Sequence, residues 1–261
     1  MPLCVDGVYR WHQPGDKVLM RHSRVYTPQR LVLSGTVELD GPASHYLLRV
    51  LRLSAGDPVT LFNGDGRDYL GEICQAQRRC AQIRILDSKV PRNESPLKIT
   101  LVQAISRGER MDYSLQKATE LGVFCVQPVT SCRVEVRLDE KRQAKRLAHW
   151  QGVVISACEQ SGRAIVPEVK IPLSLDEWLT AAGGEPRLAL DPAAATRLSA
   201  FVLNGDVVSV LAGPEGGFTA DEMDQVRANG VRAVCLGPRV LRTETAGPAA
   251  ISVLQAGAGD L

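Results

Sequence analysis

Two glycine-rich stretches near the C-terminus carry the chemistry that this sequence can support. The first, at residues 211–217, reads Leu-Ala-Gly-Pro-Glu-Gly-Gly and follows an apolar run at 207–211. The second, at residues 236–246, reads Leu-Gly-Pro-Arg-Val-Leu-Arg-Thr-Glu-Thr-Ala and follows an apolar run at 231–235. Glycine loops expose backbone N–H and C=O groups without side chains in the way, so a small ligand can lie against the main chain. The pair therefore predicts one ligand site built by two adjacent loops.

Several enzyme chemistries are excluded by what the sequence lacks. No histidine lies beyond residue 149, so no histidine general base belongs to the two loops. The patterns Gly-x4-Gly-Lys-Ser/Thr, Gly-x-Ser-x-Gly and His-Glu-x-x-His are absent, which excludes the usual triphosphate, hydrolase and zinc-protease sites. The first loop has no lysine and carries Glu215, which disfavours a triphosphate. A small, neutral or cationic cofactor fits better beside Glu215 and Glu244.

The composition indicates the cellular setting. The 261 residues are enough for two domains or one large one. No apolar run reaches the roughly 18–20 residues of a membrane span, and residues 1–19 lack the apolar core of a signal peptide. The seven cysteines form no Cys-x-x-Cys pair, which argues for reduced thiols and against a zinc site. We therefore expect a cytoplasmic protein without membrane contact and without a metal.

The N-terminal part of the chain is predicted to be separate from the loops. Residues 1–19 show no periodicity and are expected to form a poorly packed extension. Residues 20–90 are predicted to be a small β-rich unit. Within it we expect a strand at 30–33, a helix at 42–51 and a hairpin tip at the Asn-Gly-Asp-Gly of 63–66.

The C-terminal part must position the glycine loops. Residues 91–96 contain two prolines and form the expected linker. From residue 97 to 261 strand-like and helix-like patterns alternate, with a helix expected at 109–121. Thr219 and Glu222 match a capping box, in which each side chain bonds the backbone N–H of the other residue. Repeated β-α units predict an α/β fold, with a mainly parallel sheet and helices on both faces.

Together, the loops and five further segments resemble the ribosomal RNA small subunit methyltransferase E family, a branch of the knotted SPOUT methyltransferases. The five segments are 24–26 (Arg-Val-Tyr), 45–52 (His-Tyr-Leu-Leu-Arg-Val-Leu-Arg), 116–123 (Gln-Lys-Ala-Thr-Glu-Leu-Gly-Val), 157–163 (Ala-Cys-Glu-Gln-Ser-Gly-Arg) and 166–168 (Val-Pro-Glu). With the loops they cover nearly the whole chain from residue 20 onward. Their order and spacing are specific, whereas either loop alone is weak.

The resemblance implies a fold, an activity and partners. The fold is a PUA-like, RNA-binding β-barrel at residues 20–90, followed at 97–261 by a SPOUT methyltransferase domain with a deep trefoil knot. Periodicity does not predict the knot, because knots are exceptions to the rules of chain crossing. The activity is methyl transfer from S-adenosyl-L-methionine to N3 of one uridine in 16S ribosomal RNA. The partners are that RNA or the small ribosomal subunit, and a second copy of the chain in a homodimer.

The resemblance also implies which residues surround the cofactor. These are Leu190, Gly213, Glu215, Gly217, Leu236, Gly237 and Leu241. The glycines would let backbone groups meet the adenine and ribose edges, and the leucines would cover the adenine faces. A nearby carboxylate favours the cationic sulfonium. The leucines fit plain core packing equally well.

Two charged residues of the second loop are the candidates for catalysis. N3 of uridine carries a proton and is a poor nucleophile until that proton is lost. Arg242 offers a fixed fork of donors for the resulting anion, whose charge spreads to O2 and O4. Glu244 is the candidate to accept the proton or to position Arg242. The alternative is a structural salt bridge between the two residues that closes the loop.

A further set of residues is predicted to contact RNA. The set is Arg24, Tyr26, His45, Arg49, Arg52 and Arg163. The arginines would bind phosphates, and Tyr26 or His45 would stack on an exposed base. His45, Arg49 and Arg52 share one face of the helix expected at 42–51. Tyr26 and His45 also fit half-buried barrel residues, and Arg163 also fits a charge at a helix C-terminus.

Two other functions remain open at this point. The same fold could methylate another base or a ribose hydroxyl of ribosomal or transfer RNA, and the loops do not distinguish these acceptors. A non-catalytic RNA-binding factor for ribosome assembly is the alternative of another class. The intact glycine loops argue against it, because an unused site has no physical need for that pattern.

Overall fold

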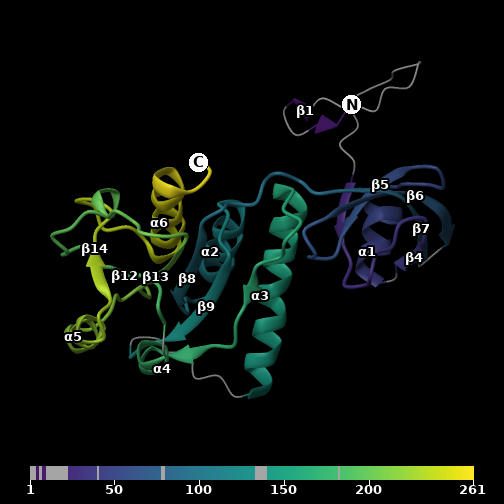
Figure 1. Cartoon of the computed structure of the whole chain (residues 1–261). Coiled ribbons are helices and arrows are strands. Elements are labelled where there is room, and N and C mark those ends of the chain that lie inside the picture. The colour runs from purple at the N-terminus through teal and green to yellow at the C-terminus, as the bar shows by residue number, and fades with distance from the viewer. Residues whose placement is uncertain are drawn as a thin grey trace. The chain divides into compact units, whose positions relative to one another are not determined.

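The computed structural model describes residues 4–5, 8–9, 23–39, 41–77, 80–132, 140–181 and 183–261. The chain divides into two compact units, Met1–Arg92 and Asn93–Leu261, and the division falls inside the expected linker (Figure 1). The extension expected at residues 1–19 lies outside the described residues, apart from the short paired strands β1 (Cys4–Val5) and β2 (Val8–Tyr9).

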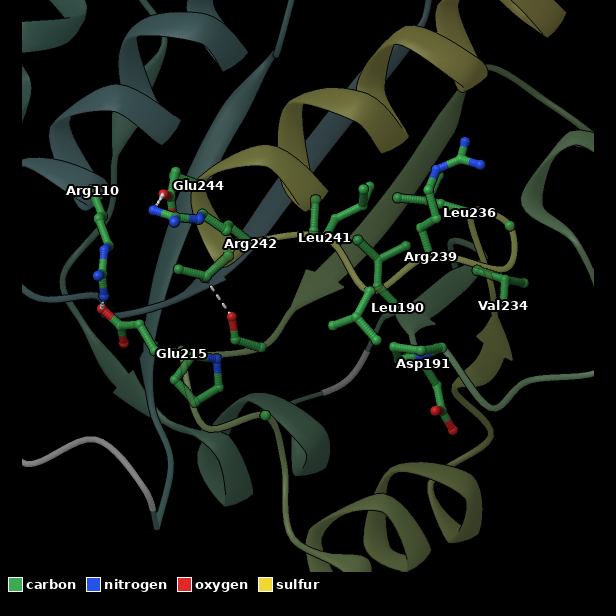
Figure 2. A pocket seen from close by; sticks show the side chains of 18 residues that line it. Arg110, Leu190, Asp191, Glu215, Val234, Leu236, Arg239, Leu241, Arg242 and Glu244 are labelled. Atoms are coloured by element: carbon green, nitrogen blue, oxygen red, sulfur yellow. Dashed lines mark hydrogen bonds and ion pairs between the residues drawn. The ribbon is translucent and has the colours of Figure 1, made fainter.

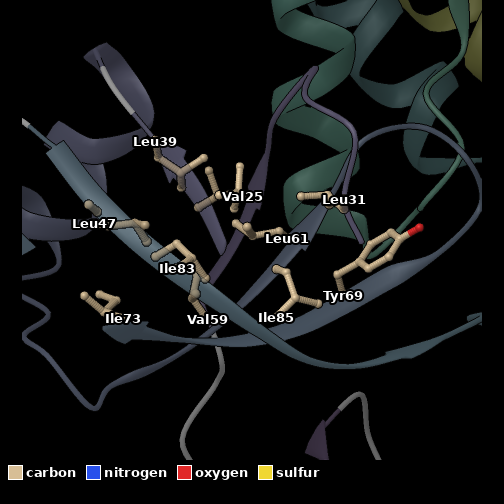
Figure 3. Packing of buried hydrophobic residues seen from close by; sticks show 12 residues of the cluster. Val25, Leu31, Leu39, Leu47, Val59, Leu61, Tyr69, Ile73, Ile83 and Ile85 are labelled. Carbon is tan, nitrogen blue, oxygen red and sulfur yellow. The ribbon is translucent and has the colours of Figure 1, made fainter. Parts of the chain in front are cut away.

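The first unit contains a five-stranded sheet in the order β3-β5-β6-β7-β4. Its strands are β3 (Ser23–Tyr26), β4 (Thr36–Leu39), β5 (Pro58–Phe62), β6 (Asp68–Gln77) and β7 (Cys80–Lys89). Along β7, the buried side chains Ala81, Ile83 and Ile85 alternate with more exposed ones, and they pack into the core in Figure 3. The predicted hairpin is confirmed, because β5 and β6 pair antiparallel and the Asp65 N–H donates to Asn63 Oδ1 in the turn.

One local prediction in this unit is wrong. No strand forms at residues 30–33, where Leu31 is buried but Val32 and Leu33 are half exposed. A turn follows at once, with Ser34 at a φ of 61°. The chain therefore bends here before it can pair as a strand.

The helix predicted at residues 42–51 is present, but it is not α-helical throughout. It consists of α1 (Gly41–His45) and a π-helical turn, η1 (Tyr46–Val50), and Arg52 leaves it with a φ of 58°. A π turn is wider than an α turn, so the face deduced from 3.6 residues per turn does not continue through it.

The second unit is built on a parallel sheet. Within the described residues it has seven strands, in the order β10-β9-β8-β13-β12-β14, with β11 also paired to β9. Their bounds are β8 (Lys98–Ala104), β9 (Cys125–Thr130), β10 (Glu168–Val169), β11 (Leu173–Ser174), β12 (Arg187–Leu190), β13 (Val207–Ala212) and β14 (Arg232–Val234). All strand pairs of this sheet among the described residues are parallel, so the predicted parallel α/β sheet is confirmed.

Helices cover this sheet. They are α2 (Glu109–Glu120), α3 (Glu140–Ser161), α4 (Leu175–Thr180), α5 (Ala220–Ala228) and α6 (Thr243–Ala258), with a short 3-10 turn η2 (Leu198–Ala200). Trp178 of α4 and Val226 of α5 belong to the same buried cluster as Val102 of β8. The neighbouring residue Leu101 points to the other face of the sheet and lies against Gly247 of α6. Neighbouring residues of β8 thus pack against helices on opposite faces of the sheet.

A close approach fixes α6 against β8. A Cβ atom at Gly247 would lie 3.1 Å from Leu101 Cδ1 and 3.2 Å from Gln103 Oε1, so glycine permits this packing. At the start of α5 the predicted capping box is confirmed, because Thr219 and Glu222 each accept from the other's backbone N–H. Within the described ranges, no helix is both long and apolar enough to cross a membrane.

Arg163 lies inside the second unit, just beyond α3. Only 6% of its side chain is exposed, and its Nη2 lies 2.7 Å from Glu94 Oε2. Its Nη1 donates to the carbonyl oxygens of Thr119 and Val123, at 3.0 and 2.9 Å. These carbonyls end α2 and the turn after it, so the guanidinium caps another helix. This position gives the expected RNA contact no support.

Replacement of this guanidinium tests its structural role. We expect Arg163→Met to lower the free energy of unfolding by about 3 kcal/mol, because it removes the charged donor from a half-buried carboxylate and from two carbonyls. Urea unfolding followed by circular dichroism measures the change. The control is Arg227→Met, whose exposed guanidinium pairs with Asp224 and Asp191, and which should cost less than about 1 kcal/mol. Wild-type stability of Arg163→Met would contradict the assignment.

Candidate active site

The two glycine loops meet at the carboxyl ends of the parallel strands. The first loop leaves the end of β13, the second leaves the end of β14, and Leu190 ends β12 between them. Loops at this edge of a parallel sheet commonly form ligand sites. Here they enclose a cavity of about 280 Å³ (Figure 2). It is lined by Arg110, Leu190, Asp191, Pro192, Gly213, Pro214, Glu215, Gly217, Val234, Leu236, Gly237, Arg239, Val240, Leu241, Arg242, Thr243, Glu244 and Ala246.

This cavity contains all seven residues expected around a cofactor and both expected catalytic residues. They are Leu190, Gly213, Glu215, Gly217, Leu236, Gly237, Leu241, Arg242 and Glu244. The sequence therefore identified two loops that share one cavity, although they follow different strands. The residues expected to bind RNA do not line it.

A buried hydroxyl joins the two loops. Thr243 Oγ1 donates to the Gly213 carbonyl at 2.6 Å, which links the start of α6 to the first loop. Gln103 Nε2, at the end of β8, donates to the same hydroxyl at 3.2 Å, and Ser106 Oγ lies 3.3 Å from it. Thr243 is 6% exposed, so these bonds are shielded from water. Sequence reasoning missed this residue, although it lies between the two expected catalytic side chains.

A second set of backbone bonds holds the base of the cavity. The connection after β12 returns across the end of β14, where the Cys235 N–H donates to the Thr196 carbonyl at 2.9 Å. The Leu198 N–H in turn donates to the Cys235 carbonyl at 2.8 Å. At the end of β12, the Asp191 N–H donates to the Val234 carbonyl at 2.9 Å. The second loop therefore starts from a fixed strand end.

One side of the cavity holds most of its apolar side chains. Figure 2 shows Leu190, Val234 and Leu236 together on this side, with the charged side chains of Asp191 and Arg239 beside them. Gly237, which follows Leu236, has a φ of 131°, a backbone conformation that residues other than glycine rarely adopt. A flat, apolar ligand group can thus lie between side chains and open backbone.

The other side of the cavity is charged. Figure 2 shows two arginines and two glutamates there: Arg110, Glu215, Arg242 and Glu244. Arg242 Nη1 lies 3.9 Å from Glu244 Oε1, and 80% of the Arg242 side chain is exposed against 16% for Glu244. A pair so long and so open does little to close a loop. The arginine is instead accessible to a molecule that enters the cavity.

Glu215 is more firmly held than the sequence suggested. Its Oε1 accepts from the Arg107 backbone N–H and from Arg110 Nη1, each at 3.0 Å. Partial burial by itself would raise the pKa of this carboxyl. The backbone N–H groups of Arg107 and Glu215 and the Arg110 guanidinium together lower the pKa by more than burial raises it. The net pKa lies below its ordinary value, so the group is ionised at neutral pH. Its charge is partly balanced by the Arg110 guanidinium.

The residues expected to bind RNA differ in exposure. His45, Arg49 and Arg52 of the first unit are exposed. Arg24 is not, because its guanidinium lies 2.6 Å from Asp68 Oδ1 and 4.0 Å above the Phe62 ring.

Tyr26 is half-buried and packs against the same Phe62 ring edge to face, at 5.5 Å between ring centres. This agrees with the alternative of a barrel residue. The exposed residues of α1, η1 and Arg52 are therefore better placed for a partner than Arg24 and Tyr26.

Two cavity residues had no signal in the sequence. Arg110 comes from α2, 105 residues before its partner Glu215. Asp191 follows β12 directly, and its Oδ2 pairs with Arg227 at 3.3 Å, which makes it a fixed part of the rim. Among the described residues, no group of three or more side chains could hold a metal ion.

Comparisons with known proteins give this cavity a context. The profile of an RNA methyltransferase domain matches residues 93–255, and that of an RNA methyltransferase PUA domain matches residues 39–86. The chain is 35% identical to the ribosomal RNA small subunit methyltransferase E of Buchnera aphidicola subsp. Schizaphis graminum, over 92% of this chain and 98% of that protein. It is 26% identical to the protein of the same name from Bacillus subtilis, over 90% of this chain and 96% of that protein.

Solved structures agree with these matches. The ribosomal RNA small subunit methyltransferase E of Neisseria gonorrhoeae, bound to S-adenosyl methionine, superposes with a TM-score of 0.87 at 41% identity, covering 92% of this chain and all of that one. A putative methyltransferase from Legionella pneumophila, in complex with the bound cofactor SAM, superposes with a TM-score of 0.89 at 39% identity. The match covers 93% of this chain and all of that one. The expected SPOUT-type α/β domain and PUA-like domain are thereby confirmed. This chain belongs to the ribosomal RNA small subunit methyltransferase E family.

Proposed function

We propose that this chain transfers the methyl group of S-adenosyl-L-methionine to N3 of a specific uridine in 16S ribosomal RNA. The observation that carries the proposal is one cavity, built by two glycine loops, that gathers its leucines on one side and two arginine–glutamate pairs on the other. A cofactor with a flat base and a cationic centre fits such a division. An acceptor base that must lose a proton fits the charged side.

The residues present suit the cofactor. Leu190, Leu236 and Leu241 would cover the adenine, and the backbone at Gly213, Gly217 and Gly237 would meet its polar edges. A Cβ at Gly213 would lie 3.2 Å from the Phe218 ring, so this backbone position is kept open by glycine. Glu215 would contribute negative charge near the sulfonium while it remains bonded to Arg110. When bound, the cofactor supplies an electrophilic methyl group.

Arg242 and Glu244 would act on the acceptor. The open guanidinium of Arg242 can donate to a uracil oxygen and stabilise the negative charge that develops as N3 loses its proton. Glu244 lies beside it and is mostly shielded from water, which suits a carboxylate that accepts the N3 proton. The charge then stays within the site, because the carboxylate is neutralised as the anion forms.

RNA binding, assembly and location belong to the same proposal. His45, Arg49 and Arg52 are exposed and would bind phosphates or stack on a base. A homodimer near the cavity would cover Val240, which is 81% exposed at the rim. A trefoil knot is consistent with the backbone bonds that Cys235 makes to Thr196 and Leu198. These bonds hold the connection after β12 against the end of β14, from which the chain continues through the second loop into α6. A cytoplasmic location would follow from a ribosomal substrate.

The proposed function is tested by radiolabelled methyl transfer. Small subunits from a strain that lacks the modification are incubated with the protein and labelled S-adenosylmethionine, and the labelled nucleotide is identified by mass spectrometry. We expect one N3-methyluridine in 16S ribosomal RNA. Label on another base or on a ribose would reject the acceptor. No label together with no cofactor binding in calorimetry would favour the assembly factor.

Removal of the accessible arginine should affect turnover and not cofactor binding. We expect Arg242→Ala to lower kcat by about 100-fold, the usual cost of one donor to a developing anion. The dissociation constant for S-adenosylmethionine, measured by calorimetry, should stay within about twofold, because Arg242 lies on the charged side. Unchanged single-turnover methylation would refute the role of Arg242.

A substitution at Gly237, by contrast, should weaken binding of the cofactor. We expect Gly237→Ala to weaken S-adenosylmethionine binding by about tenfold or more, because a φ of 131° costs alanine about 1–3 kcal/mol and the loop will relax. Calorimetry measures the binding, and thermal unfolding checks that the variant is folded. The matched control is Gly184→Ala, where a Cβ meets nothing within 4 Å and which should bind as the wild type does. Equal affinities for both variants would contradict the assignment.

A further inference from the structure

Arg110 is a charged cavity residue that the proposed mechanism does not yet use. It comes from the first turn of α2, outside both glycine loops, and lies on the charged side with Arg242 (Figure 2). Its side chain is 46% exposed. It is thus accessible to a molecule that enters the cavity.

The position of Arg110 is fixed by one bond that leaves most of its donors free. Its Nη1 donates to Glu215 Oε1 at 3.0 Å, and this is its one hydrogen bond or ion pair within the described part of the chain. The same carboxylate oxygen is held by the Arg107 backbone N–H. A guanidinium has five N–H donors, so Arg110 keeps donors for a ligand while Glu215 prevents it from swinging away.

The acceptor requires stabilisation at two points. When uridine loses its N3 proton, the negative charge spreads to O2 and O4, which flank N3 on opposite sides. One guanidinium beside O2 leaves O4 without a charged donor, and the reverse is equally true. Arginines that reach the cavity from two different elements, α2 and the start of α6, match this pair of oxygens.

We propose that Arg110 is a second acceptor-binding arginine, which donates to the uracil oxygen that Arg242 does not bind. The inference rests on the proposed function. In the reaction, the N3 proton passes to Glu244, and the freed N3 electron pair forms the bond to the methyl carbon. The electron pair of the broken carbon–sulfur bond stays on sulfur, which becomes a neutral thioether. Arg110 and Arg242 lower the energy of the anion between these events.

The test compares Arg110→Ala with the wild type on the same RNA, over a range of pH. Alanine suits an exposed helix position, so the variant should fold. We expect kcat near neutral pH to fall by about 100-fold, and the inflection of the pH–rate profile to move up by about two units, because the N3 anion is less stabilised. Binding of S-adenosylmethionine should not change.

A more acidic acceptor sharpens the test. RNA that contains 5-fluorouridine at the target has a more acidic N3–H, so it depends less on Arg110, and the gap between variant and wild type should narrow. The control is Lys98→Ala, which removes one positive charge at the opposite end of β8 and should leave every value unchanged.

Each other outcome overturns the inference in a recognisable way. A raised KM for RNA with the same deficit at every pH and on both RNAs would make Arg110 a phosphate contact. Weakened cofactor binding would make it a support for Glu215, and wild-type rates would leave it no role. If the wild type itself forms no N3-methyluridine, the proposed function fails and this inference fails with it.

Discussion

The hydroxyl group of Thr243 is the contact on which the active site depends. It donates to the Gly213 carbonyl of the first glycine loop, accepts from Gln103 at the end of β8, and begins the helix that follows the second loop. The ends of β13 and β8 already lie side by side, with Ala212 paired to Gln103, and the hydroxyl joins the start of α6 to both. Because the hydroxyl is buried, each of its bonds would be costly to leave unmade. The shape of the cavity is thus set by a side chain that lies between Arg242 and Glu244.

This constraint explains how the cavity separates its two tasks. Strand ends hold the apolar side, where Gly237 leaves backbone open beside Leu190 and Leu236. The charged side is supplied by helix starts, with Arg110 in the first turn of α2 and Glu244 in the first turn of α6. Both carboxylates there have an arginine beside them, so the charges nearly balance before any ligand enters. A cationic methyl donor and an acceptor that becomes anionic can then meet without a large net charge at any stage.

Much of this arrangement could be predicted from local patterns. The parallel sheet, the capping box of Thr219 and Glu222 and the hairpin at residues 63–66 depend on short-range chemistry, and all three are present. The predicted strand at 30–33 is wrong, because a turn overrides propensity there, and the predicted helix at 42–51 is present but continues as a π-helical segment from Tyr46. A motif for α4 was available in the Ser-x-x-Glu of residues 174–177, which forms a capping box that the pattern reading overlooked.

The sequence by itself determined which residues could form a ligand site, because glycine loops after apolar strands are legible in a linear chain. Only the tertiary structure decided which charges serve that site. Arg163 looked available for RNA, yet it is buried against Glu94, 69 residues away. Arg110 had no signal in the sequence, yet it meets Glu215 at the cavity. The physical reason is that a charge takes its role from the partner and the solvent around it, and both are set by contacts between distant parts of the chain.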